Sequence, residues 1–209
     1  MSDPRRYIVF VDFDGTLIRR DSLFMFLRFV RHQRGKRFGM NAKMIAACAA
    51  YALRMLSAGD AKCRLLTAVA KGLGIERFDK ICLDFVSEIE KNINASVLEK
   101  IEKCKEEGTE IVVVSASFRN WLAPYAAKKG YGLICTEVAV EGDPIERIIL
   151  SSSNCRGEEK VVRIKRWLAE QYPENTREDF HITAIGNGKG DKEMLEFADE
   201  AIAVSQVGD

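Results

Sequence analysis

Long apolar runs and paired cysteines are both missing from this sequence of 209 residues. The charge-free part of one predicted helix, residues 44–53, is ten residues long, whereas a helix that spans a bilayer needs about 20 apolar residues. The apolar run at residues 7–11 is interrupted by Asp12 and is too short for the core of a secretory signal. The six cysteines occur singly, without a C-x-x-C pair, which favours a chain kept in the reducing cytoplasm.

Low-complexity segments and internal repeats are also missing. Apolar residues make up 47% of the chain and charged residues 30%, as in ordinary globular proteins, so the composition argues against disorder. A chain of 209 residues has the size of one domain and is long enough to bury a sizeable core. We therefore expect a single folded core, with room for one insertion.

Acidic residues are absent from one long stretch in the first part of the chain. Between Arg28 and Arg54 there are seven basic residues and no acidic one. Residues 1–64 carry a net charge of +8 (13 basic, 5 acidic), and residues 65–209 carry −7 (19 basic, 26 acidic). Such a stretch can bind nucleic acid, a membrane surface or a small anion, or it can be a solvated face. Because nothing else supports nucleic-acid binding, we do not expect a nucleic-acid partner.

The most informative segment is a short strand that ends in acidic residues. Residues 7–11 are apolar and mostly β-branched or aromatic, which predicts a strand buried on both faces. The next residues are Asp12-Phe13-Asp14-Gly15-Thr16. Ligands of parallel α/β sheets bind beyond the carboxyl ends of strands, so these carboxylates are candidate catalytic groups. Asp and Gly are also common turn residues, so this segment alone fits a simple turn equally well.

Only helical patterns follow, up to about Asn94. The first helix is expected to begin after an N-cap at Asp21 or Ser22. A second helix is expected to bury one face, formed by Met40, Met44, Ala47, Tyr51 and Met55. Further helical patterns run through residues 65–69 and residues 78–89.

From about residue 95, strands alternate with helices. Strands are expected at residues 111–114, 133–140, 181–185 and 201–204. Turn residues at 141–144 place a hairpin at residues 138–150. Alternation of this kind implies right-handed crossovers and a parallel sheet. The predicted fold class is α/β: a doubly wound, Rossmann-like parallel sheet formed by residues 1–18 and 95–209, with a helical cap inserted at residues 19–94.

Three of the predicted strands run into polar residues. Asp12 and Asp14 follow the first strand, Ser115 follows the second, and Asn187 and Asp191 follow a later one. The carboxyl ends of parallel strands lie along one edge of the sheet, so these residues should converge. Carboxylate and amide oxygens suit a hard cation such as Mg²⁺, which keeps coordination places for water and phosphate oxygens. This expected convergence favours a catalytic site over a simple turn.

Four motifs together resemble the haloacid dehalogenase superfamily, specifically its phosphoserine-phosphatase-like branch with a helical cap after the first strand. In the order of that family, the matching segments are Asp12-Phe13-Asp14-Gly15-Thr16, Val114-Ser115, Gly157-Glu158-Glu159-Lys160 and Gly186-Asn187-Gly188-Lys189-Gly190-Asp191. The resemblance extends over essentially the whole chain.

The resemblance implies a two-step phosphoryl transfer. Asp12 would attack phosphorus to form an aspartyl-phosphate, and Asp14 would protonate the leaving alcohol and then activate water. Lys160 would pair with the phosphate and with Asp12. Arg156 is a competitor, because phosphoserine phosphatases carry their lysine directly before the glycine that corresponds to Gly157. Lys160 is preferred because it lies near the predicted helix start, beside the buried face.

The resemblance also implies a phosphate cradle and a magnesium site. The cradle would be formed by Ser115, Ala116, Gly15 and Thr16. The magnesium ligands would be Asp12, Asp14 (through its backbone carbonyl), Asn187 and Asp191. The fourth motif of the family usually begins Gly-Asp, so Asn187 leaves this site with one negative charge fewer and with lower expected metal affinity. Whether Asn187 or Asp191 is the main ligand from this motif stays open.

A second departure bears on the substrate. Asp21 stands where phosphoserine phosphatases place a glutamate that contacts the amino group of the substrate. Its side chain is shorter by one methylene and would hold that amine poorly. Asp21 is therefore a candidate specificity residue, and phosphoserine is not the expected substrate.

The leading interpretation is a magnesium-dependent phosphatase that acts on a small phosphorylated metabolite, as a monomer or a homodimer. A dehalogenase is disfavoured, because those relatives lack a second carboxylate like that of Asp14. One alternative is a lipid-phosphate phosphatase: some relatives in this branch hydrolyse phosphatidylglycerophosphate, and the basic cap segment could contact an anionic membrane. Another alternative, suggested by Asn187, is a catalytically weak phosphate-binding module.

Overall fold

The computed structural model describes residues 5–35, 42–188 and 190–205. A five-stranded sheet with the order β3-β2-β1-β6-β7 lies at its centre, and its neighbouring strands are parallel. The strands are β1 (Arg6–Asp12), β2 (Glu110–Phe118), β3 (Gly132–Thr136), β6 (Phe180–Gly186) and β7 (Glu200–Ala203). The predicted doubly wound parallel sheet is confirmed.

Strand β1 is the middle strand of the sheet, because β2 and β6 pair with it on opposite sides. Its residues from Ile8 to Asp12 are buried, as the continuous apolar run predicts. Asp12 lies beside Val114 of β2, and Val11 lies beside Ile185 of β6. The carboxyl ends of these three strands therefore lie at one edge of the sheet, at the point where the strand order reverses.

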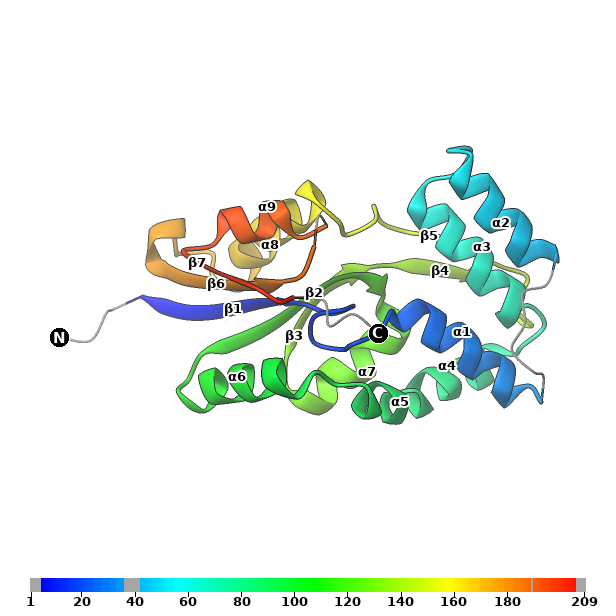
Figure 1. The fold of residues 1–209 in the computed structure, drawn as a ribbon, viewed down its shortest axis with the longest axis horizontal. Coiled ribbons are helices and arrows are strands. Elements are labelled where there is room, and N and C mark those ends of the chain that lie inside the picture. Colours follow the sequence, from blue (N-terminus) through cyan, green and yellow to red (C-terminus); the bar gives the residue numbers. More distant parts are fainter. Residues whose placement is uncertain (1–4, 36–41, 189, 206–209) are drawn as a thin grey trace.

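Helices cover both faces of the sheet (Figure 1). One face carries α6 (Ala95–Glu106) and α7 (Arg119–Lys129), and the other carries α8 (Glu158–Gln171) and α9 (Lys192–Phe197). A short 3-10 helix, η1 (Arg177–Asp179), precedes β6. Alternate residues of β1 enter two separate clusters of buried apolar side chains, one on each face. Both faces of the central strand are thus used for core packing.

A group of helices, which we call the helical insert, lies between β1 and α6 in the sequence. Its members are α1 (Ser22–Gln33), α2 (Ala42–Ala52), α3 (Ala58–Ala70), α4 (Ile75–Asp84) and α5 (Val86–Lys91). In Figure 1, α1 to α4 lie to the right, beyond the carboxyl ends of the central strands. No helix of the described residues is both long enough and apolar enough to cross a membrane.

The start of α1 agrees with the sequence prediction, whereas residues 78–89 form two helices. Asp21 is the N-cap of α1, and its carboxylate accepts a hydrogen bond of 3.1 Å from the backbone N–H of Phe24. The helical pattern through residues 78–89 is not one helix, because α4 and α5 are separated at Phe85. The ring of Phe85 packs against the ring of Phe26, with 5.0 Å between centroids, so the break occurs where the chain is anchored in the core.

The predicted buried face of α2 is wrong in part. Met44 and Ala47 are buried, but Tyr51 and Met55 are 49% and 73% exposed, and α2 ends at Ala52. Met40 lies outside the described residues. The helical period predicted which residues share one side of the helix, but α2 packs along α3 with a shorter strip than the period suggested.

A hairpin from the second half of the sequence packs against the helical insert. It consists of β4 (Val138–Glu141) and β5 (Arg147–Leu150), which are antiparallel, as predicted. Strand β5 lies against α3, where Thr67 Oγ1 accepts a hydrogen bond of 2.9 Å from the backbone N–H of Ile148. A Cβ atom on Gly59 would lie 2.7 Å from Leu150 Cδ1, so α3 approaches β5 closely enough that any larger residue there would displace the end of the Leu150 side chain.

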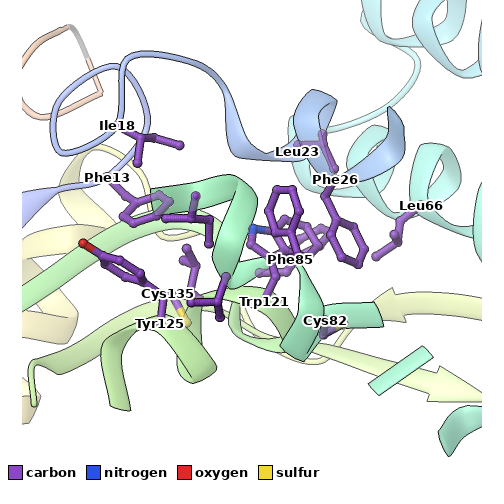
Figure 2. Close-up of a cluster of buried hydrophobic side chains, with 14 of the residues drawn as sticks. Phe13, Ile18, Leu23, Phe26, Leu66, Cys82, Phe85, Trp121, Tyr125 and Cys135 are labelled. Carbon is purple, nitrogen blue, oxygen red and sulfur yellow. The ribbon is translucent and has the colours of Figure 1, made fainter. Parts of the chain in front are cut away.

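One apolar cluster joins the helical insert to the sheet (Figure 2). Phe26 of α1 stacks on Trp121 of α7, with centroids 4.5 Å apart and ring planes at 22°. Phe13, directly after β1, meets Tyr125 of α7 edge to face at 5.7 Å. Because Leu66 of α3 belongs to the same cluster, the insert and the sheet share a continuous core rather than two separate ones.

Candidate active site

The acidic segment after β1 both turns the chain and carries the candidate catalytic groups. Gly15 has a φ angle of 75°, which glycine adopts at little cost. The backbone N–H of Thr16 donates to the carbonyl of Phe13 at 3.3 Å, which closes the turn. Asp12 is 6% exposed and Thr16 is fully buried. The two interpretations of this segment from sequence are therefore compatible.

Both carboxylate oxygens of Asp12 accept hydrogen bonds. Lys160 Nζ donates to Oδ1 at 2.7 Å, and Thr16 Oγ1 donates to Oδ2 at 2.8 Å. Burial raises the pKa of Asp12 to about 6, against the opposing effect of the Lys160 ammonium, and the carboxylate of Asp191 raises it further. The hydrogen bonds orient a carboxylate whose negative charge is poorly solvated.

Lys160 is the buried cation of this site. It comes from the first turn of α8, is 1% exposed, and donates to Asp12, to Asp191 Oδ1 at 2.6 Å and to the carbonyl of Val114 at 2.9 Å. Burial alone would lower the pKa of Lys160, but the two carboxylates raise it, so the ammonium form is retained. Arg156, the competing residue, is exposed. The structure therefore places Lys160, and not Arg156, against Asp12.

Asp14 is held by groups that the sequence did not suggest. Ser117 Oγ donates to its Oδ2 at 2.6 Å, and the backbone N–H of Ser22 donates to its Oδ1 at 2.6 Å. Ser115, which was predicted to hold phosphate, also donates to Asp14 Oδ2, at the longer distance of 3.4 Å. Burial and the nearby charge of Asp21 raise the pKa of Asp14, and the hydrogen bonds from Ser117 and Ser22 oppose that rise. Asp14 is thus fixed in a half-buried environment whose net effect is a raised pKa.

A second layer of contacts holds the groups around Asp14. The hydroxyls of Ser22 and Ser117 are 2.8 Å apart, and Trp121 Nε1 donates to Ser22 Oγ at 3.3 Å. The backbone N–H of Ser117 donates to Ser115 Oγ at 3.0 Å. The Ser-Ala-Ser sequence was a usable signal for Ser117, because residues two apart in a strand lie on the same face.

The loop after β6 connects the fourth motif to the other carboxylates. Asp191 Oδ1 accepts from Lys160, and its Oδ2 accepts from the backbone N–H groups of Asn187 at 3.0 Å and Gly188 at 3.3 Å. A Cβ atom on Gly186 would lie 2.7 Å from the Cβ of Asp191, so this packing requires glycine. Lys189 lies outside the described residues.

Three oxygen-bearing groups near the end of β1 are candidate ligands for a magnesium ion. Asn187 Nδ2 lies 3.0 Å from the backbone carbonyl oxygen of Asp14, so rotation of the Asn187 amide by half a turn would present its oxygen at that position. The Asp12 carboxylate belongs to the same strand end. These groups fit a hard cation that retains several waters. Among the described residues no group of three or more His, Cys, Asp or Glu side chains could hold a metal.

A lysine from the helical insert also reaches the site. Lys62 of α3 donates from Nζ to the carbonyl of Ala116 at 3.0 Å. Burial lowers the pKa of Lys62, while the charges of Asp14 and Asp21 raise it and that of Arg156 lowers it further. Lys62 was not among the predicted site residues, because it is one basic residue among many and only the fold brings α3 to the end of β2.

The remaining predicted residues lie around these groups. Asp21 is exposed, and its carboxylate is used to cap α1, close enough to Asp14 and Lys62 to affect the pKa of each. The Thr16 hydroxyl donates a hydrogen bond to Asp12, and the carbonyl of Ala116 accepts one from Lys62. The predicted convergence of distant residues at one edge of the sheet is therefore observed.

The sequence profile of the haloacid dehalogenase-like hydrolases matches residues 9–196, which includes all the site residues described above. The chain belongs to this family. The predicted family resemblance is confirmed, and the protein is a hydrolase of the haloacid dehalogenase type with the fold expected for it.

Individual proteins are similar to this chain in sequence or in structure. The protein CicA of Caulobacter vibrioides is 28% identical over 199 residues, which cover 92% of this chain and 83% of CicA. A protein of unknown function from Bordetella pertussis has a similar structure, with a TM-score of 0.78, 21% identity, and coverage of 95% of this chain and 90% of its own. A phosphoserine phosphatase captured as a phospho-aspartyl intermediate analogue has a TM-score of 0.59, 20% identity, and coverage of 95% and 86%. These structural similarities describe the fold of the hydrolase.

Proposed function

We propose that this hydrolase is a magnesium-dependent phosphatase that cleaves a phosphomonoester through an aspartyl-phosphate. The supporting observation is the pair of carboxylates at the end of β1, which have different partners. Asp12 accepts from an ammonium group and a hydroxyl, whereas Asp14 accepts from two neutral donors, Ser117 Oγ and Ser22 N–H. Two nearby carboxyl groups in different environments suit one nucleophile and one acid–base group.

In the first step a carboxylate oxygen of Asp12 forms a bond to phosphorus, and the bond between phosphorus and the ester oxygen breaks. Asp14 gives its proton to the departing alcohol, which is consistent with its raised pKa. In the second step Asp14 takes a proton from water, the water oxygen bonds to phosphorus, and the bond to Asp12 breaks. Free phosphate leaves, and Asp12 is regenerated.

Lys160 is assigned to hold Asp12 in position and to neutralise charge as the phosphate approaches. Its three hydrogen bonds fix the ammonium group beside Asp12. Asp191 accepts from Lys160 and from the backbone of the loop after β6, so we assign it to position both of them. We assign Asn187 to the metal, because its side-chain amide lies 3.0 Å from the backbone carbonyl oxygen of Asp14. Magnesium held by Asp12, the Asp14 carbonyl and Asn187 would offset repulsion between the nucleophile and the phosphate dianion.

The helical insert is assigned as a cap that helps to select the substrate. Lys62 supplies a cation from α3 at the edge of the site, and Asp21 adds a carboxylate at the start of α1. A small phosphorylated metabolite in the cytoplasm is the favoured substrate, with the protein acting as a monomer or homodimer. Ser115, the turn at Gly15 and Thr16, and the backbone near Ala116 would hold phosphate oxygens.

The test is phosphate release from a panel of sugar, amino-acid, nucleotide and lipid phosphates, with magnesium present. We expect turnover on at least one class, loss of turnover in Asp12→Asn, and retention of a trapped phosphoryl-enzyme in Asp14→Asn. The trapped species follows because Asp14 would no longer activate water, although formation of the intermediate also slows. Turnover that survives Asp12→Asn would contradict the mechanism.

A second candidate is a phosphate-binding module with little turnover, and Asn187 is the observation that favours it. Replacement of the usual aspartate by asparagine removes one negative charge from the metal site. Tight binding of phosphate and magnesium, measured by calorimetry without phosphate release from any ester in the panel, would support this candidate. Restored turnover in Asn187→Asp would identify the metal charge as the missing element.

A further inference from the structure

Helix α2 is apolar around most of its surface, yet it buries only Met44 and Ala47. Its exposed side carries a row of apolar residues, namely Ile45, Ala46, Ala49, Ala52 and, just after the helix, Leu53. A helix that is apolar all round is normally buried in a large core or in lipid. In Figure 1, α2 lies at the outer edge of the helical insert, away from the sheet. This face, which we call the α2 face, is therefore an exposed apolar surface.

The turn that ends α2 extends the same surface. Arg54 has a φ angle of 57°, a left-handed conformation that costs a residue other than glycine about 1 kcal/mol or more. The turn is closed by hydrogen bonds from Arg54 N–H to the carbonyl of Tyr51 and from Met55 N–H to the carbonyl of Ala50. It presents Leu53 and Met55, which are 71% and 73% exposed, on either side of the arginine. Glycine would adopt this backbone conformation without strain, but the residue at this position is an arginine.

Charge distinguishes among possible occupants of the α2 face. Lys43 lies in the first turn of α2 and Arg54 just beyond its last, and both are exposed. No acidic residue occurs between Asp21 and Asp60 in the sequence. The carboxylate of Asp60 is itself engaged by the Ser57 hydroxyl at 2.7 Å. The apolar row is thus bordered at both ends by cations.

A second copy of the chain fits this pattern poorly. In a two-fold dimer the same patch meets itself, so the cations at the ends of one α2 would face those of the other. No carboxylate on α2 could neutralise them. An anionic bilayer supplies both complements, with phosphate groups for Lys43 and Arg54 and acyl chains for the apolar row.

We propose that the α2 face, together with the Leu53-Arg54-Met55 turn, docks the protein onto anionic lipid bilayers. The helix lies along the surface, its apolar row enters the boundary between headgroups and acyl chains, and the flanking cations pair with lipid phosphates. This docking concerns a surface outside the candidate active site and does not depend on the proposed activity.

Flotation on a density gradient tests the proposal, with vesicles of phosphatidylcholine alone or of equal parts phosphatidylcholine and phosphatidylglycerol. We expect the wild-type protein to float with the mixed vesicles at low salt, and to float less at high salt and with the neutral vesicles. Leu53→Asp should lower the partition coefficient by roughly tenfold or more, because an apolar side chain becomes a charge. Arg54→Gly should lower it about fivefold, while the relieved turn keeps thermal stability undiminished.

Leu83→Asp is the matched control. Leu83 is 59% exposed and also belongs to the helical insert, but it lies on α4, at the opposite end from α2 (Figure 1). Its substitution should leave flotation unchanged. The proposal is overturned if wild-type protein stays at the bottom with anionic vesicles at low salt. It is equally overturned if Leu83→Asp matches Leu53→Asp, or if sedimentation equilibrium finds a dimer that Ile45→Asp splits, because the α2 face would then belong to a second copy.

Discussion

At the scale of single residues, Asp12 combines burial with a lysine partner, and in the proposed mechanism it must be ionised to attack phosphorus. Its pKa is raised to about 6 by burial, so the carboxylate form is lost as the pH falls through that value. In metal-free protein, the ¹³C NMR signal of the Asp12 carboxylate should titrate with a midpoint of about 6. Added magnesium favours the charged form, so the midpoint, and with it the acid limb of kcat/KM, should move to lower pH.

In the same NMR spectra, the carboxylate signal of Asp199 is a reference for that of Asp12. The pKa of Asp199 is lowered, because hydrogen bonds from Ile182 N–H and Arg177 outweigh the effect of its burial. Its signal should titrate below the ordinary range of aspartate. A midpoint for Asp12 close to that of an unperturbed aspartate in metal-free protein would contradict the buried environment described above.

Ser117 is expected to position Asp14. Ser117→Ala removes the 2.6 Å hydrogen bond to Asp14, and loss of a hydrogen bond to a charged or charge-developing group costs about 1–3 kcal/mol. We expect kcat to fall about tenfold or more while KM changes little, because in the proposed mechanism Asp14 acts only after the substrate is bound. Steady-state kinetics on the best substrate of the panel measure both.

Ser152→Ala is the control for Ser117. The Ser152 hydroxyl is also hydrogen-bonded, accepting from Glu137 N–H at 2.8 Å, but Ser152 lies outside the site. Its kcat should match that of the wild type. A fall in kcat of the same size in both variants would indicate general loss of structure rather than mispositioning of Asp14.

The Michaelis constant KM can show whether Lys62 contacts the substrate. Lys62→Met keeps the length of the side chain but removes the cation that the helical insert brings to the site. If Lys62 contacts an anionic substrate, KM should rise about tenfold while kcat stays within about twofold. Lys43→Met, an exposed lysine on α2, should leave both constants unchanged. If Lys62→Met and the wild type have the same KM and kcat, Lys62 does not contribute to substrate binding.

At the scale of elements, the loop after β6 depends on the packing of one glycine. Gly186→Ala would place a Cβ atom 2.7 Å from the Cβ of Asp191, so Asp191 must shift and with it the ion pair to Lys160. We expect lower stability, by about 1–3 kcal/mol, and lower activity. Urea unfolding and phosphate release measure the two effects.

Gly188→Ala provides the comparison within the same loop. A Cβ atom on Gly188 would meet no atom within 4 Å. Stability and activity should therefore stay close to those of the wild type. Two variants with equal losses would show that the loop tolerates no side chain at all, and that contact with Asp191 is not the cause.

At the scale of the whole molecule, metal binding should stabilise the folded protein, because the ligands come from separate elements and converge only after folding. Magnesium at about 100 times its Kd should add about 2.7 kcal/mol to the free energy of unfolding, seen as a rise in Tm. Asn187→Ala should reduce this rise, and Asn187→Asp should give the same rise at lower magnesium concentration. An unchanged magnesium response in Asn187→Ala would exclude Asn187 as a ligand.

The shared core also belongs to this scale. Phe26, Trp121 and Phe85 connect α1 and the α4–α5 junction to α7, so the helical insert and the sheet are expected to unfold together. In the sequence the helical insert lies between two parts of the sheet, but in the structure it shares one apolar core with the sheet. The β4–β5 hairpin strengthens this connection, since it leaves the sheet and packs on α3.

The sequence alone determined the parallel sheet, the helical insert, the main catalytic candidates and the family. It could do so because a buried strand is a continuous apolar run, and because carboxyl ends of parallel strands must share an edge. Asp12, Asp14 and Lys160 could be predicted from these local signals and the motifs together.

Only the tertiary structure decided which side chains hold the candidates and which surfaces stay exposed. Ser22 and Lys62 carry no distinctive local signal, and they meet Asp14 or the end of β2 through contacts across the fold. The strand pattern places Ser117 on the same face as Ser115, but only the fold brings its hydroxyl to Asp14. The helical period placed Tyr51 on the same side of α2 as the buried Met44 and Ala47, but Tyr51 is exposed, because burial depends on which neighbouring element packs against that part of the helix. Periodicity is a property of one element, whereas burial and hydrogen bonding are properties of the contact between elements, and that contact forms only when the chain folds.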